Sequence, residues 1–337
     1  MVKGVNTQGA ELEGGPEARR GPRPVEPGVA AVALVVVAAA LLRPLLEELL
    51  GRPAVAHWAT IFVAIAVQAL PFLVLGVVIS AAVAALVPAG LLPRLLPARQ
   101  ALAVPVAAAA GVALPGCECG SVPIAGRLVD RGAPPAAALA FLLSAPAVNP
   151  VVLTATAVAF PGRPQVVVAR LLASLLTATV VGLLWARSGR DDLLARARRP
   201  VPEGPPLAVL AATAQHDLLQ AGGFLIVGAA TAATLQTVVP RSVLDAVAGA
   251  GPVAFLALAA LAVALALCSE ADAFVAASLT QFSLGARLAF LVVGPMVDVK
   301  LVALQAGTFG RGFALRFAPL TLAVALLSSA VVAWWLL

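Results

Sequence analysis

Long apolar stretches, separated by short polar or Gly/Pro-rich connections, fill the chain from residue 28 to its end. A helix needs about 20 apolar residues to cross the hydrocarbon core of a bilayer. The stretches of about that length, which predict crossing helices, are 28–50, 57–87, 135–160, 165–187, 207–239, 284–309 and 314–337. The pattern therefore predicts an all-α polytopic membrane protein.

Two further apolar stretches, 101–128 and 252–280, are interrupted by "PGCECG" and "CSEAD". Pro115, Gly116 and Gly120 cannot continue a helix cleanly. Inside the hydrocarbon, non-helical backbone is tolerated only where protein or a watery cavity surrounds it. We expect each stretch to form a broken re-entrant hairpin, which gives about 7 crossings plus 2 hairpins, or 8–9 spans if the hairpins cross.

The chain also repeats itself. "QALPFLVLG" at 68–76 matches "QAGGFLIVG" at 220–228. Further on, a single offset of 149 residues aligns Cys119 with Cys268, Pro146 with Pro295, and Asn149 with Asp298. Matched blocks in the same order predict two structural repeats, an arrangement typical of transporters.

The positions of Lys and Arg decide how the broken stretches sit. If both stretches cross, the loops of the two sides hold ten basic residues each. If both return to their own side, fifteen lie on the side of the Arg-rich loop 187–199 and five on the other. Membrane proteins keep Lys and Arg in cytoplasmic loops, so the count favours hairpins. Each repeat then crosses three times, which inverts one repeat relative to the other.

Composition supports a multi-pass membrane protein. The chain is 61% hydrophobic and 11% charged, whereas a soluble domain carries about a quarter charged residues. Its lipid bilayer and a small solute or ion are the expected partners; nucleic acid is not, and homo-oligomerisation stays open. The expected organisation is a disordered cytoplasmic tail 1–27, first helix and loop 28–54, repeat 55–187, Arg-rich cytoplasmic linker 188–206 and repeat 207–337.

The cysteines carry the first candidate chemistry. Cys117 and Cys119 flank Glu118 at one break, and Cys268 opens the other. Thiolates select soft ions and metalloids, so these thiols are candidate substrate ligands. The alternative is that they are small buried residues that pack. Three cysteines are too few for a disulfide scaffold, and we expect no cofactor and no resident metal.

Charged residues inside apolar stretches are the second set. A charge at the centre of a bilayer costs at least about 2.5–3.5 kcal/mol on insertion scales, so such residues are usually paired or functional. The candidates for proton coupling, with structural pairing as the alternative, are Glu118, Glu270, Asp272, Asp298 and Lys300. Asp298 and Lys300 flank one residue and would not face each other on a helix, so each is expected to pair elsewhere.

One predicted helix in each half contains a proline. Pro146 in "SAPAVNP" and Pro295 in "VGPMVD" each free a backbone carbonyl one turn earlier. Ser144, Asn149 and Asp298 either complete a substrate site there or satisfy the kink. Gln68 and Gln220 predict interhelical hydrogen bonds, whereas His57, His216 and Asp217 are expected at the membrane interface.

The segment "GCECGSVPIAGRLVDRGAPPAAALAFLLSAPAVNPVV" resembles the signature of the ArsP/UPF0718 (DUF318) family of predicted permeases. "CSEADAFVAASL" followed by "AFLVVGPMVDVKLV" is similar to that family's C-terminal signature, and the likeness covers about residues 55–337. The resemblance implies an inner-membrane permease. Some members of the family export trivalent organoarsenicals, and many have no assigned substrate.

The sequence thus favours a secondary transporter, not an enzyme, whose site lies between two inverted hairpins. We expect it to export a small solute, and the candidates include a thiophilic metal, a metalloid and an organoarsenical. No ATP-binding or dinucleotide-binding motif is present in the sequence. The alternatives are an intramembrane thiol oxidoreductase using Cys117 and Cys119, and a membrane subunit that does not itself transport.

Overall fold

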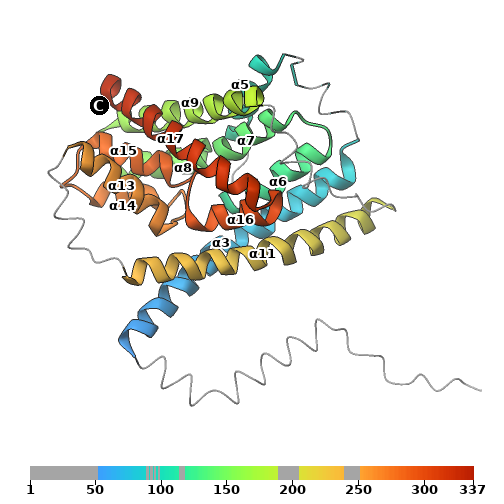
Figure 1. The fold of residues 1–337 in the computed structure, drawn as a ribbon, viewed down its shortest axis with the longest axis horizontal. Coiled ribbons are helices and arrows are strands. Elements are labelled where there is room, and N and C mark those ends of the chain that lie inside the picture. Colours follow the sequence, from blue (N-terminus) through green and yellow to red (C-terminus); the bar gives the residue numbers. More distant parts are fainter. Residues whose placement is uncertain are drawn as a thin grey trace, which may run out of the picture. The chain divides into compact units, whose positions relative to one another are not determined.

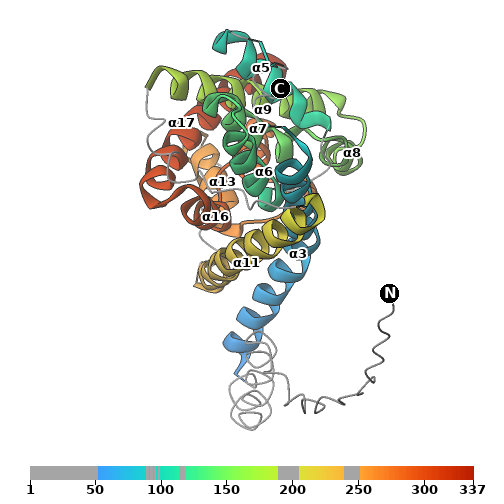
Figure 2. The same cartoon turned by 90° about the vertical axis from the view of Figure 1, so that its right-hand side faces the viewer.

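Two long helices, α3 (Pro53–Leu86) and α11 (Pro206–Val238), lie side by side along one face of the bundle (Figures 1 and 2). The computed structural model describes residues 52–88, 99–113, 118–188, 205–238 and 251–337, and single positions between 88 and 99. The predicted tail, the predicted first helix 28–50 and most of the linker 188–206 lie outside the described residues. At 1.5 Å per residue each of these two helices is about 50 Å long, enough to cross a bilayer at a tilt.

The first half continues with a hairpin and a broken helix. The first hairpin consists of α5 (Gln100–Ala110), prolonged by the 3₁₀ turn η1 (Gly111–Ala113), and α6 (Glu118–Asp130). The broken helix consists of α7 (Pro135–Val148) and α8 (Pro150–Ala159), and α9 (Pro164–Ser188) closes this half. Neither arm of the hairpin is long enough to span a bilayer alone.

The second half places the same kinds of element in the same order. After α11, the second hairpin consists of α13 (Pro252–Leu265) and α14 (Asp272–Ser278). A second broken helix follows as α15 (Leu284–Val293) and α16 (Val299–Phe309), and α17 (Arg311–Leu336) ends the chain. The described residues contain helices and connections but no strand, as expected for an all-α membrane protein.

The two broken helices share one local structure at the break. Asn149 precedes α8 and its side chain accepts a hydrogen bond from the Val152 amide at 3.0 Å. Asp298 precedes α16 and accepts from the Leu301 amide at 2.5 Å. Both are therefore N-caps, which satisfy amides that the helix start leaves without a partner. The alignment of Asn149 with Asp298 in sequence thus corresponds to one structural role.

Contacts along α3 give the direction of the first hairpin. Gly76 packs against the backbone of Gly120, and the hydroxyl of Ser80 donates to the carbonyl of Pro123 at 3.3 Å. Because the residue numbers of these two contacts increase together along both helices, α3 and α6 run in the same direction. Because α5 starts after the end of α3, it must return toward the middle of α3 before α6 begins. The first hairpin therefore enters and leaves at one end of the bundle.

The second hairpin opens at the other end. Trp185 at the end of α9 packs on Phe313 and Phe317 at the start of α17, whereas Gly285 at the start of α15 contacts Ala333 near the end of α17. The chain leaves α14 and begins α15 at the end opposite to the start of α17. Figure 1 shows the same separation, with α13, α14 and α15 grouped on one side and α5 and α6 on the other.

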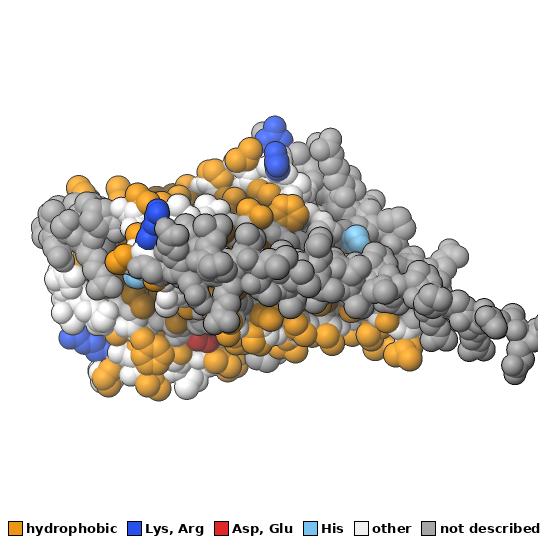
Figure 3. All heavy atoms as spheres, turned by 90° about the horizontal axis from the view of Figure 1, so that it is seen from below, with side chains coloured by type: hydrophobic (Ala, Val, Ile, Leu, Met, Phe, Trp, Pro, Cys, Tyr) orange, Lys and Arg blue, Asp and Glu red, His pale blue; other side chains and the backbone are white. Residues whose placement is uncertain are grey.

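Apolar side chains cover much of the described surface. Figure 3 shows hydrophobic side chains over much of the visible face and only a few charged groups among the described atoms. Val67 and Leu70 on α3 and Leu219 on α11 are all more than half exposed. Apolar side chains are unfavourable in contact with water. Helices of this length that expose so many of them are therefore expected to be surrounded by lipid. Five described helical stretches are long and apolar enough to cross a membrane.

Candidate functional site

Lys300 lies where parts of both halves converge. Its ammonium contacts Oε1 of Glu118, the first residue of α6, at 2.5 Å. It also donates to the carbonyl of Ala266 at 3.1 Å and lies 3.7 Å from Oδ2 of Asp298. All four residues are buried. Lys300 therefore joins the start of α6, the end of α13 and the break before α16.

The backbone of the second hairpin makes one of these contacts available. Ala266 follows α13 in the left-handed conformation, with a φ of 47°, which ends the helix. Ending a helix inside the bundle leaves carbonyls that need a donor, and the Lys300 ammonium supplies one to Ala266. This is the kind of freed carbonyl expected from the interrupted sequence, and here a side chain of the protein binds it.

Two thiols lie beside this cluster. Cys119, the second residue of α6, and Cys268, just after α13, are both buried and reduced. Both lie within electrostatic range of the Lys300 ammonium. The parts of the two hairpins that carry the aligned cysteines thus approach the same lysine. Cys117, Pro115 and Gly116 lie outside the described residues.

The second hairpin is held by an arginine from the first half. Arg170 of α9 is buried; it contacts Oδ2 of Asp272 at 2.9 Å and donates to the carbonyl of Ser269 at 3.1 Å and to the hydroxyl of Thr156 at 2.8 Å. Glu270, half-buried, lies within electrostatic range of Asp272. The sequence signal for Arg170 is a charge in the middle of the apolar run 165–187, which does not say what the side chain contacts.

The two hairpins are therefore tied in reciprocal fashion. Glu118 of the first hairpin is paired with Lys300 of the second half, and Asp272 of the second hairpin is paired with Arg170 of the first half. Each of these two carboxylates thus receives its cation from the opposite half. Removing one member of such a pair leaves an uncompensated buried charge, which is strongly unfavourable.

Lys300 pairs elsewhere, with Glu118, as expected, but it also lies close to Asp298, which was not expected. The ion pair of Lys300 with Asp298 at 3.7 Å exists because Asp298 is not helical. Its extended backbone, with φ of −139° and ψ of 167°, precedes α16 and directs the carboxylate back over the first turn. A capping position therefore brought together two residues that a continuous helix would have separated.

The polar residues at the first break hydrogen-bond mainly to backbone. The amide of Asn149 donates to the carbonyl of Ala145 at 3.1 Å, and the hydroxyl of Ser144 donates to that of Phe141 at 3.2 Å. Ser144 packs directly against Gly111 at the end of α5. Pro146 lies in the last turn of α7, and Pro295 lies in the turn between α15 and α16. These contacts satisfy the broken backbone and bring Ser144 close to the first hairpin.

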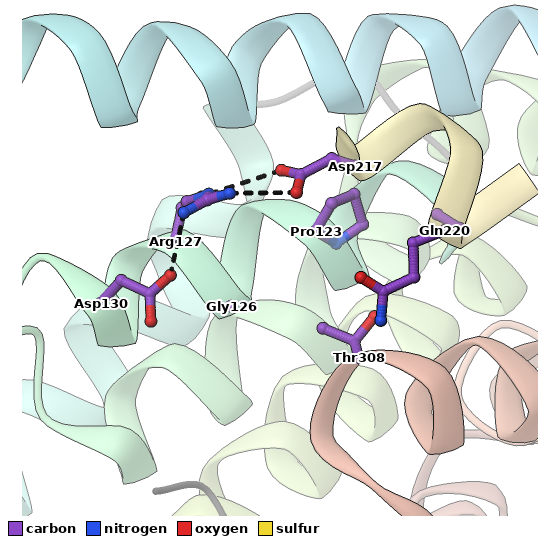
Figure 4. Close-up of a pocket in the computed structure, with 8 residues that line it drawn as sticks. Pro123, Gly126, Arg127, Asp130, Asp217, Gln220 and Thr308 are labelled. Carbon is purple, nitrogen blue, oxygen red and sulfur yellow. Dashed lines mark hydrogen bonds and ion pairs between the residues drawn. The ribbon is translucent and has the colours of Figure 1, made fainter. Parts of the chain in front are cut away.

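A third charged cluster joins α6 to α11 and α3 (Figure 4). Arg127 contacts Oδ1 of Asp217 at 3.0 Å and Oδ2 of Asp130 at 3.2 Å, and the Ser80 hydroxyl donates to Asp217 at 3.0 Å. Asp217 is buried in this cluster, whereas an interfacial position was expected because it lies in the first turns of its helix. The buried position of Asp217 depends on partners that are far away in sequence, so the local pattern around it does not predict that position.

Nearby, the side chain of Gln220 donates to the carbonyl of Gly307 at 2.7 Å, an interhelical hydrogen bond of the kind expected. Its aligned counterpart, Gln68, is exposed. No group of three or more His, Cys, Asp or Glu side chains is arranged to hold a metal ion within the part of the chain that the structure describes.

The helices, their apolar surface and the buried charged clusters define a multi-pass bacterial membrane protein. The chain belongs to a family described as predicted permease, whose sequence profile matches residues 54–334. It is 37% identical over 262 residues to the UPF0718 protein YcgR of Bacillus subtilis, which covers 75% of this chain and 89% of the relative. It is 32% identical over 266 residues to a protein of Streptococcus mutans named as a subunit of a two-component membrane permease complex, covering 76% of this chain and 88% of that one.

No solved structure matches the chain.

Proposed function

We propose that this permease is a secondary transporter that exports a small solute across the inner membrane and couples export to protons. Its solute site lies where the start of α6, the end of α13 and the break before α16 meet. The observation that carries the proposal is the buried contact of Lys300 with Glu118, which connects two inverted halves beside Cys119 and Cys268. Broken elements that meet near the middle of the membrane are where inverted-repeat transporters bind substrate.

Charge balance supports an exchangeable cation or proton in this cluster. Glu118 and Asp298 bring two carboxylates, and Lys300 brings one ammonium. With all three ionised, the cluster carries one net negative charge in a region where such a charge is costly. A proton on one carboxylate, or a cationic solute, removes that cost. Uptake of the proton or solute from one side of the membrane and its release to the other side then make up a transport cycle.

The thiols supply the chemistry that would select a soft solute. Cys119 and Cys268 lie on different hairpins and approach the same lysine. Thiolates prefer soft metals and metalloids over hard cations. In this mechanism Glu118, Asp298 and Lys300 pass the proton, and the thiols contact the solute. Rocking of one half against the other alternates the side that has access.

The test begins with identification of the solute. A deletion strain is screened for sensitivity to metals, metalloids and organoarsenicals, and flux of the positive compound is then measured in proteoliposomes with and without a pH gradient. Glu118→Gln should abolish gradient-driven flux and retain solute exchange, and Glu270→Gln tests the half-buried carboxylate of the second hairpin in the same way. Undiminished driven flux in Glu118→Gln would remove the coupling role. Unchanged solute binding in the double variant Cys119→Ser with Cys268→Ser would mean that the thiols pack and do not bind the solute.

A second candidate comes from the relative in Streptococcus mutans, which is named as a subunit of a two-component permease complex. In that case the chain forms the membrane pathway only together with another subunit. Flux from the purified chain alone would contradict this candidate. Flux that requires co-expression with a second component would support it.

A further inference from the structure

We infer that the open groove between the two arms of the first hairpin binds a phospholipid with an anionic headgroup. The acyl chain lies along the groove, and the phosphate meets arginines at the open end of the hairpin, where the chain enters α5 and leaves α6. This inference goes beyond the proposed transport function and does not depend on it. Three features carry it: the apolar walls of the groove, the helix ends that point to its mouth, and the positive charge there.

The groove exists because the two arms of the hairpin pack on other helices. α5 packs mainly on α7 and α9, whereas α6 packs mainly on α3 and α7. Figures 1 and 2 both show α7 between the two arms. The space left between the arms has a volume of about 360 Å³ and is open to the surroundings of the protein.

The walls of the groove are apolar throughout. They extend from Ile79 of α3 and Leu128 of α6 to Phe141 of α7, and α5 contributes only alanines, Ala107 and Ala110. Such small side chains leave room that a leucine would fill. Apolar surface favours hydrocarbon over water, and the groove belongs to a protein of the membrane. An acyl chain is therefore the occupant that its walls fit.

Two helices begin at the open end of the hairpin. Gly182 of α9 lies against Val104 of α5 and Ala136 of α7. Gly111, directly after α5, packs on Ser144 of α7. Because these residue numbers increase together, α5 and α7 run in the same direction. Neither helix has a side-chain cap at its start, so the positive ends of two helix dipoles lie at the mouth of the groove, where they attract a phosphate.

Three arginines lie at the same end. Arg94 and Arg99 precede α5 and are exposed, and Arg131 follows α6. Leu96, between the first two, and Ala133, just after the third, both line the groove. Arg131 is half-buried, and its Nε has no hydrogen-bond partner within the described residues. Guanidinium groups bind phosphate through paired hydrogen bonds, so a lipid phosphate supplies the acceptors that this end of the hairpin lacks.

The charge at the mouth also fixes its depth in the membrane. Asp130, the acidic residue next to Arg131 in sequence, contacts Arg127 at 3.2 Å. Exposed arginines are costly in hydrocarbon and lie at the level of the headgroups, and the groove continues inward from them. Basic residues beside a space between membrane helices are a known arrangement for anionic headgroups. The mouth and the groove thus match the two parts of one phospholipid.

The test counts lipid bound to the purified full-length chain. Delipidated protein in detergent is titrated with phosphatidylglycerol and with phosphatidylcholine of the same acyl chains, and bound lipid is counted by native mass spectrometry. We expect phosphatidylglycerol to bind at least about fivefold more tightly. Equal affinity for the two lipids would overturn the inference.

Charge variants test the mouth. Arg99→Gln with Arg131→Gln should weaken binding of phosphatidylglycerol about fivefold for each arginine removed and abolish the preference over phosphatidylcholine. Arg311→Gln with Arg316→Gln removes the same charge from exposed positions at the start of α17 and should leave the preference intact. Equal loss in both double variants would mean unspecific attraction to basic surface and would overturn the inference.

A matched pair of alanines tests the groove. Ala109 and Ala110 are neighbours on α5 and both are exposed, but only Ala110 lines the groove. Ala110→Leu should weaken binding of both lipids at least about fivefold because its side chain takes the place of part of the acyl chain. Ala109→Leu should have no effect. Unchanged binding in Ala110→Leu, or displacement of the lipid by millimolar inorganic phosphate, would leave only an anion site and would overturn the inference.

The result is independent of transport. No solute or pH gradient enters the lipid titration, so a chain that fails to transport can still show the preference for phosphatidylglycerol and its loss in the two groove variants. A chain that transports but binds both lipids alike would lose this inference alone.

Discussion

Arg170 and Asp272 lie 102 residues apart in sequence and meet at 2.9 Å inside the bundle, where the arginine also bonds the Ser269 carbonyl. The contact fixes the second hairpin to a helix of the other half.

Neutralising Arg170 should destabilise the protein more than neutralising both partners. Arg170→Gln leaves the Asp272 carboxylate buried without its cation, which typically costs about 3–5 kcal/mol. The double variant Arg170→Gln with Asp272→Asn should recover much of the lost thermal stability, measured by tryptophan fluorescence in detergent. Arg163→Gln is the control, since Arg163 is exposed. Equal stability of Arg170→Gln and Arg163→Gln would show that the buried pair contributes nothing.

Lys300→Arg should uncouple the protein without unfolding it. The guanidinium can keep the contact with Glu118 but cannot give up its proton in a protein. We expect the melting temperature to stay close to that of the wild type while flux driven by a pH gradient is lost, for the solute found in the toxicity screen. Retention of full driven flux would show that the amine takes no part in proton movement.

Asp298→Asn separates capping from charge. Asn149 already caps α8 at the equivalent break, so asparagine at 298 should keep the α16 cap and full stability. Asp298→Ala, in contrast, should cost about 0.5–2 kcal/mol, as Asn149→Ala should. If Asp298 also balances the charge of Lys300, Asp298→Asn should change the pH dependence of flux. An unaltered pH profile in a stable Asp298→Asn protein would leave capping as its role.

The direction of the hairpins can be tested by labelling from either side of the membrane. Single cysteines at positions 94 and 131, in a cysteine-free background, should react with an impermeant maleimide only from the cytoplasmic face. A cysteine at position 163 should react only from outside. Reaction of 94 and 131 from opposite faces would mean that the first hairpin crosses the bilayer, and the inverted arrangement would have to be abandoned.

Proximity of the two thiols can be tested by oxidation. In a background that lacks Cys117, Cys119 and Cys268 should form a disulfide with copper phenanthroline if their Cα atoms come within about 7 Å during the cycle. Substituting Lys300 by Met, which removes the charge between the hairpins, should raise the yield. A yield no higher than that of Cys119 with a cysteine at the exposed position Leu219 would place the thiols apart.

Local pattern was sufficient for much of the architecture. The interruptions predicted the two hairpins, because Pro and Gly act on their own neighbours. The helices 135–160 and 284–309 were expected to be kinked at Pro146 and Pro295, whereas each is divided in two by a capping residue. The alignment of Asn149 with Asp298 identified two positions that make the same capping bond. The boundaries of the two repeats and the side of each loop remain predictions.

The partners of the charged residues were not available from local pattern. Glu118 and Lys300 are 182 residues apart, and Arg127 and Asp217 are 90 apart. A charge within an apolar run indicates that a partner exists but does not say which one. Arg170 had such a signal and received no assignment. The geometry of Asp298 with Lys300 depended on a cap, which a continuous helix would not have allowed.

The reciprocal ties between the halves set an order of events during biosynthesis. When Glu118 is added to the growing chain, its partner Lys300 is still 182 residues from being made. At 5–20 residues per second that interval is about 9–36 s. During this interval the Glu118 carboxylate has no ammonium to neutralise it. We therefore expect either that α6 remains outside the hydrocarbon or that Glu118 is protonated. The first hairpin then takes its final place only when the last third of the chain has been inserted.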